Sequence, residues 1–158
     1  MSDLGDQKKS IVQQLKEIPA MVLAIEKRSH AGFALVAGQI LDTTLEEVLV
    51  NHMPGLNKDM RKRLFSGFGP LATFSSRIHI AEALGLIDKT FAKELHKMRV
   101  IRNMFAHSMR TLHFEDEKVL ELLAKLSEPS NGRLPQKHFV EAVAEAVKAL
   151  TPLMKTEE

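Results

Sequence analysis

Apolar side chains recur along most of the chain at spacings of three and four residues, the period of an α-helix with one buried face. The longest stretch of this kind runs from about Ser29 to His52, and a second clear one runs from Lys89 to about His107. Proline, glycine and asparagine interrupt the pattern and mark helix ends. No alternation of period two lasts long enough to predict a strand. The pattern therefore predicts an all-α fold, a bundle of about six to seven helices.

The interruptions divide the chain into expected helices. They cover about residues 6–18, 29–52, 58–65, 71–84, 89–107, 115–126 and 136–154, with a further short segment at 20–27 that follows Pro19. Asn57 and Asp88 are expected as N-caps, and Gly85 as the residue that follows a helix C-terminus. The length of 158 residues suits one domain. We expect it to span 1–158, with a core over about 20–127 and the helix at 136–154 packed on that core.

Composition excludes several classes of protein. The chain has no cysteine, which excludes disulfides, cysteine-ligated zinc and thiol catalysis. No apolar run reaches the roughly 20 residues of a membrane span, and the N-terminus is polar, so we expect a soluble cytoplasmic protein. The seven histidines show no metal-ligand spacing in the sequence. We therefore expect no metal and no cofactor.

Charge is distributed unevenly. Residues 58–113 carry 11 basic and 4 acidic side chains, a net of +7, between two acidic flanks. This basic middle segment indicates a possible nucleic-acid contact, or else cations that simply solvate a short helix around Arg61. A helix-turn-helix around Gly85 is disfavoured, because Glu94 falls where its second helix needs an apolar contact.

The segment 89–107 has two faces of unusual composition. At 100° per residue, one arc holds five apolar side chains: Phe91, Leu95, Met98, Ile101 and Phe105. Arg102 points into this arc, so we expect it either to pair with a carboxylate (Asp42, Glu46 or Glu47) or to lie at a cleft between two subunits. A second, polar stripe consists of His96, Arg99, Asn103 and His107. His107 would interact there with the helix dipole, unless the stripe is functional.

Two resemblances rest on these residues. The run from Arg102 to His107 resembles the Arg-x4-His motif of HEPN domains, which are all-α bundles, often dimeric, and in many cases metal-independent ribonucleases. The stretch from Gly69 to His107 resembles the mannitol operon repressor family. That resemblance depends on Gly69-Pro70-Leu71, on Ser76-Arg77, and on Gly85-Leu86-Ile87 before an arginine-rich helix.

The second resemblance implies a transcriptional regulator that acts mainly through protein–protein contacts, while the HEPN resemblance implies a homodimer. The first leaves an endoribonuclease as the alternative, in which His107 is the base, Arg102 holds the phosphorane charge and Asn103 orients them. With or without this activity, His96, Arg99 and Arg77 are expected to line a groove. Arg102 and His107 diverge by about 140° on a straight helix, so they converge only if the helix ends near Ala106 or a second subunit supplies one of them. A helical interaction module without activity is the third possibility.

Overall fold

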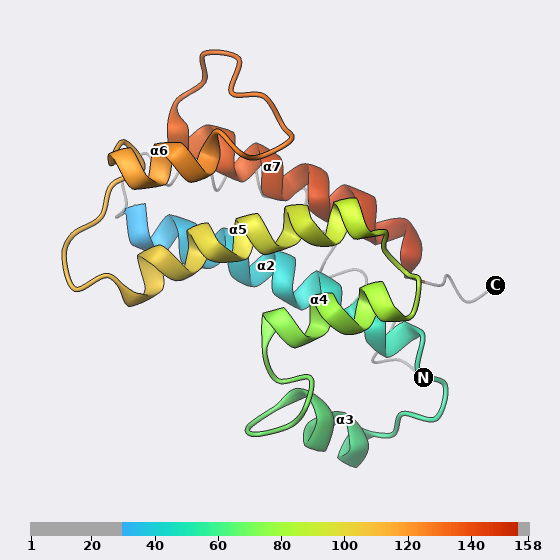
Figure 1. Ribbon diagram of the computed structural model, residues 1–158. Coiled ribbons are helices and arrows are strands. Elements are labelled where there is room, and N and C mark those ends of the chain that lie inside the picture. The colour runs from blue at the N-terminus through green and yellow to red at the C-terminus, as the bar shows by residue number, and fades with distance from the viewer. Residues whose placement is uncertain (1–29, 155–158) are drawn as a thin grey trace.

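The computed structural model describes residues 30–154, and this part of the chain is helical, without a strand (Figure 1). The helices are α2 (His30–Asn51), α3 (Lys58–Phe65), α4 (Phe74–Ala83), α5 (Lys89–His107), α6 (Glu117–Leu123) and α7 (Pro135–Leu150), followed by a 3-10 turn, η1 (Thr151–Leu153). The predicted all-α bundle is confirmed. The helices expected over 6–18 and 20–27 lie outside the described residues. None of the helices described is both long and apolar enough to cross a membrane.

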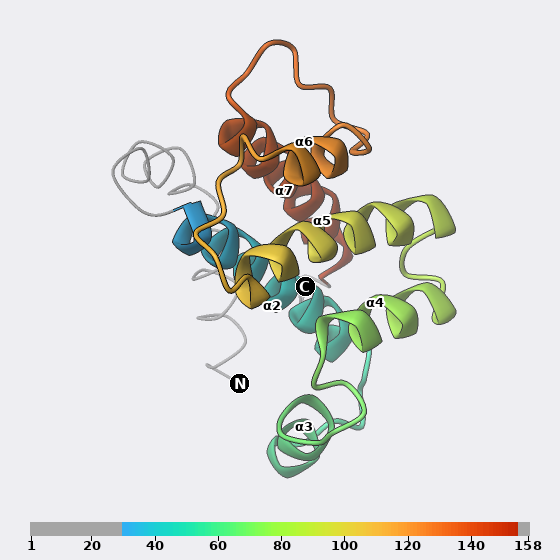
Figure 2. The same ribbon diagram turned by 60° about the vertical axis from the view of Figure 1, so that its left-hand side comes forward.

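Helix α2 is the central element. It packs against α7 and against α5, while α4 contacts both α2 and α5, and α6 lies against α5 and α7. Helix α3 lies at one end of the molecule, reached by a loop on either side, in both views (Figures 1 and 2). Buried side chains occur on more than one side of α2, as expected for a helix covered by two others. They include Phe33, Ala37, Leu41, Thr44, Leu45, Val48 and Leu49. The expected packing of α2 on α5 is confirmed, and α7 completes the core.

Helix ends agree with the sequence where a side chain caps the helix. Asn57 accepts a hydrogen bond from the Met60 amide, and Asp88 accepts one from the Phe91 amide, as expected. Gly85 has a positive φ of 70°, the conformation that glycine adopts readily after a helix.

Other helix ends differ from the sequence prediction. Helix α4 begins at Phe74 instead of residue 71, because the Thr73 side chain caps it by accepting from the Ser76 amide. The amide of Leu71 is already used, since it donates to the Leu64 carbonyl (2.8 Å). Helix α6 is shorter than the predicted 115–126, and α7 stops at Leu150, where η1 takes over from the predicted helix to 154.

A phenylalanine outside the helices joins three of them. Phe114 belongs to the connection between α5 and α6, yet it is fully buried. Its ring centroid lies 5.6 Å from that of Phe33 in α2, 4.6 Å from Phe105 in α5 and 5.7 Å from Phe139 in α7. The connection is therefore fixed to the core at this residue.

Candidate functional site

Helix α5 carries most of the residues that the sequence singles out. Its apolar face is buried as expected at Leu95, Met98, Ile101 and Phe105, whereas Phe91 is only partly buried. The polar residues His96, Arg99, Arg102 and Asn103 are partly buried instead of fully solvated. Helix α5 thus places cationic, imidazole and amide side chains at the edge of the core. The hydrogen bonds and ion pairs of each side chain determine which of them are free to bind another molecule.

Arg102 lies at the contact between α5 and α2. Its Nη1 donates to Oδ1 of Asn103 (3.0 Å), while its Nε is buried and has no hydrogen-bond partner in residues 30–154. The expected pairing of Arg102 with a carboxylate is wrong, because within the described chain no acidic side chain forms a hydrogen bond or ion pair with it. A place at a cleft between subunits stays a prediction for this side chain.

Arg102 lacks a carboxylate partner because two other arginines, Arg77 and Arg61, pair with the acidic side chains of α2. Arg77 is 6% exposed, and its guanidinium contacts Asp42 Oδ1 (2.8 Å) and Glu46 Oε2 (2.9 Å). Its remaining donors bind backbone carbonyls, with Nε 2.8 Å from the Leu71 oxygen. Burial raises the pKa of Asp42, although the Arg77 guanidinium opposes the shift. Arg77 therefore binds α4 to α2 inside the chain. Its expected place in a groove stays a prediction.

Arg61 completes this ion-pair cluster from α3. Its Nη2 contacts Oε1 of Glu46 (2.9 Å) and also the carboxylate of Glu47, which is buried. The sequence does not predict this pairing, since Arg61 is expected there either in a nucleic-acid contact or on a solvated helix. The contact positions α3 on the end of α2.

His96 and Arg99 form a second polar group with His79 of α4. Arg99 Nε donates to His96 Nδ1 (3.3 Å), and the rings of His96 and His79 lie 4.8 Å apart. Burial lowers the pKa of His96, and the neighbouring charges of Arg99 and His79 lower it further. His96 is therefore neutral at physiological pH and serves as a hydrogen-bond acceptor.

His107 stands apart from these residues. It is the last residue of α5 and is exposed, and in residues 30–154 no hydrogen bond or ion pair involves it. Helix α5 ends at His107, just past Ala106, and keeps its helical geometry up to that residue, so within the chain His107 and Arg102 stay on different faces. Joint action of these two side chains requires a second copy of the chain.

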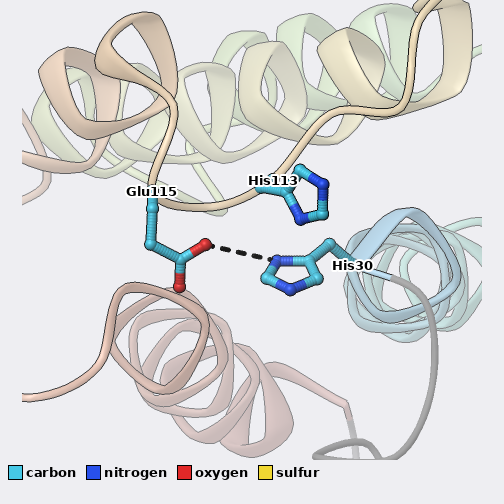
Figure 3. A group of neighbouring side chains, drawn as sticks. All are labelled: His30, His113 and Glu115. Atoms are coloured by element: carbon cyan, nitrogen blue, oxygen red, sulfur yellow. Dashed lines mark ion pairs between the residues drawn. The ribbon is translucent and has the colours of Figure 1, made fainter.

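One group of side chains within residues 30–154 contains the residue types of a metal site and brings them close together (Figure 3). His30 begins α2, and His113 and Glu115 flank Phe114 in the connection between α5 and α6. One potential ligand atom from each residue lies within 4.8 Å of the others. Spacing along the chain does not reveal this group, because His30 lies far from the other two residues in sequence.

Comparison with known proteins places the chain in a family. The family model described as "Mannitol repressor" matches residues 24–155. The chain belongs to the mannitol repressor family. The resemblance based on residues 69–107 is thereby confirmed, together with the expected class of repressor-like regulator, whereas the HEPN resemblance stays a prediction.

A solved structure shows the same fold. It is titled "X-ray structure of the MtlR-HPr complex from Escherichia coli", and it aligns with this mannitol repressor family member at a TM-score of 0.57 and 18% sequence identity. The alignment covers 93% of this chain and 95% of that one. No curated protein matches the chain.

Proposed function

We propose that this protein is a transcriptional regulator that acts by binding a partner protein, and that the partner is the HPr of its own organism. The observation that carries the proposal is the match of the mannitol repressor family over residues 24–155. Support comes from the similar structure, which was solved as a complex of MtlR with HPr.

The end of the molecule formed by α3 and the loop after it has the character of a protein contact. Phe68 is 109% exposed relative to its reference state, so its ring contributes nothing to the core of this chain. Lys62 and Arg63 are exposed beside it in sequence. An aromatic anchor with a charged rim is typical of protein interfaces. We place the partner contact on this surface, which we call the α3 surface (Lys58, Lys62, Arg63 and Phe68).

Calorimetric titration of the full chain with HPr from the same organism tests both the binding of HPr and its location on the α3 surface. We expect binding by the unmodified chain and a loss of at least about tenfold in affinity for Phe68→Ser, since anchors of this kind contribute about 2 kcal/mol or more. Met109→Ser is the matched control, because Met109 is also fully exposed but lies in the α5–α6 connection. Absence of HPr binding would overturn the proposed function. Equal binding by Phe68→Ser would overturn only the placement on the α3 surface.

A ribonuclease is the second candidate, favoured by one observation at Arg102. Its Nε has no acceptor within residues 30–154, and because the atom is buried, a group from outside the chain would reach it only after a local rearrangement. A homodimer could place His107 of a second copy near it. RNA cleavage in the presence of EDTA, lost in both Arg102→Ala and His107→Ala, would establish this activity. We expect no cleavage, and we expect light scattering to give the mass of a dimer.

The basic segment 58–113 also offers a nucleic-acid contact. Several of its cations are committed to carboxylates, as Arg61 and Arg77 are to Glu46. The exposed ones that remain include Lys58, Lys62 and Arg63 of α3. Binding of operator DNA through them would weaken steeply with salt. A salt-independent effect of the protein on transcription would instead point to the protein contact.

A further inference from the structure

We propose that His30, His113 and Glu115 bind one divalent transition-metal ion, with Zn²⁺ as the ion of best fit. The spacing of histidines along the chain predicts no metal, because it contains no ligand pattern. The fold brings the three side chains together from the start of α2 and from the connection between α5 and α6 (Figure 3).

The distances fit a site that closes around an ion by small rotations. His30 Nδ1 lies 3.7 Å from Glu115 Oε2, and the two imidazole rings lie 4.8 Å apart at 74°. Tetrahedral zinc with bonds of about 2.1 Å holds its ligand atoms about 3.4 Å from one another. His113 and Glu115 are both exposed, so their side chains can make this adjustment, of about 1 Å, without disturbing the core.

The kinds of ligand define the class of metal. Two imidazoles and one carboxylate are a frequent set for zinc sites that keep a fourth position for water. Magnesium and calcium prefer oxygen ligands throughout, so they are expected to bind poorly. The chain has no cysteine, so thiolate ligands do not compete for the ion.

His30 is already held in position by the backbone. Its Nδ1 accepts a hydrogen bond from the Phe114 amide (3.0 Å), a contact across 84 residues of sequence. The same nitrogen is the one that lies toward Glu115. An ion bound at Nδ1 would use the lone pair that now accepts the Phe114 N–H. Metal binding would therefore break this hydrogen bond, and the Phe114 amide would move away from the imidazole. This displacement gives the site a signature that other surface histidines lack.

Metal binding would connect two distant parts of the chain. The ion would join the first residue of α2 to the connection between α5 and α6, next to Phe114 in the core. A ligand that binds only the folded state stabilises that state. Zinc is therefore expected to raise the melting temperature of the whole protein.

Titration of the metal-free full chain with zinc chloride, followed by calorimetry, tests the site. We expect one Zn²⁺ per chain, and an affinity at least about tenfold weaker in His113→Gln and in Glu115→Gln, a loss typical even of groups that only support a ligand. The matched controls are His107→Gln and Glu117→Gln, an exposed histidine and an exposed glutamate nearby in the same part of the chain. We expect both controls to bind as the unmodified chain does.

Two further readouts bear on the mechanism. The Phe114 amide resonance is expected to move on addition of zinc in the unmodified chain and to stay in place in His113→Gln. Zinc is expected to raise the melting temperature of the control variants but not that of His113→Gln or Glu115→Gln. Equal zinc binding by all four variants, no binding by the unmodified chain, or one ion per two chains would each overturn the proposal.

Discussion

Gly38 shows how one residue decides where Arg102 can lie. A Cβ atom at Gly38 would stand 2.4 Å from Cγ and 3.1 Å from Cβ of Arg102. These atoms are near the backbone, so the arginine side chain cannot move away easily. Because Gly38 has no side chain, the Cβ and Cγ atoms of Arg102 can pack directly against the backbone of α2.

We expect Gly38→Ala to destabilise the protein. Overpacking of this kind costs about 1–3 kcal/mol, against a gain of roughly 1 kcal/mol for alanine over glycine within a helix. In an Arg102→Ala background the clash is gone, so the same substitution should become neutral or stabilising. Urea unfolding of the unmodified chain, of Gly38→Ala, of Arg102→Ala and of the double variant measures this change of sign. Gly55→Ala is the control, with no atom within 4 Å of its added Cβ; an equal effect of Gly38→Ala in both backgrounds would contradict the account.

At Glu94, burial and hydrogen bonding have opposite effects on the pKa of the carboxyl group. Burial acts to raise the pKa of Glu94, but hydrogen bonds from the Ser127 amide (2.6 Å), the Ser127 hydroxyl (2.9 Å) and Lys97 (2.9 Å) prevail, and the pKa is lowered. The unfolded chain then takes up the proton at higher pH than the folded one. The stabilisation is therefore complete above the ordinary value of 4.5 and is lost as the pH falls through the lower pKa of the folded state.

Glu94→Gln is accordingly expected to lower the free energy of unfolding at pH 7 by about 1.5–3 kcal/mol, the range for hydrogen bonds to a charged group. It should also weaken the dependence of stability on pH below about 4.5. Urea titrations at a series of pH values measure both effects. Glu117→Gln, at an exposed glutamate, should reproduce the unmodified curve. An unchanged acid-side slope in Glu94→Gln would refute the assignment.

Among the elements, helix boundaries were predictable from the sequence where the signal is local. The side chains of Asn57 and Asp88 accept hydrogen bonds from backbone amides three residues later. Such N-caps can be predicted from the neighbouring residues alone. The start of α4 was not predictable, because it depends on the Leu71 amide, which donates to the carbonyl of Leu64 in another element. The same distinction applies to the candidate site. The stripe on α5 follows from spacing, whereas the partners of Arg77 lie as far as 35 residues away and are brought to it only by the fold.

Arg77 ties α4 to α2, and its removal tests how elements are held together. Arg77→Met would leave Asp42 and Glu46 without this buried cation, and breaking such a pair costs about 3–5 kcal/mol. Arg63→Met, at an exposed arginine in α3, should change stability by no more than about 0.5 kcal/mol. Denaturant unfolding measures both. A loss for Arg77→Met as small as that of the control would show that Arg61 alone satisfies the acidic side chains.

For the molecule as a whole, Phe114 is the residue at which the helices meet. Its ring contacts Phe33, Phe105 and Phe139, one from each of α2, α5 and α7, and no part of it is exposed. Truncation of a buried phenylalanine costs about 3–5 kcal/mol, because the lost burial is joined by an unfilled cavity. Phe114→Ala should therefore lose this amount in urea unfolding, with a single cooperative transition, since three helices share the defect. Phe68→Ala removes the same ring from the exposed α3 surface and should stay within about 0.5 kcal/mol of the unmodified chain. If Phe114→Ala lost less than about 1 kcal/mol, the connection between α5 and α6 would be peripheral to the core, and a metal ion bound beside it would have little effect on the melting temperature.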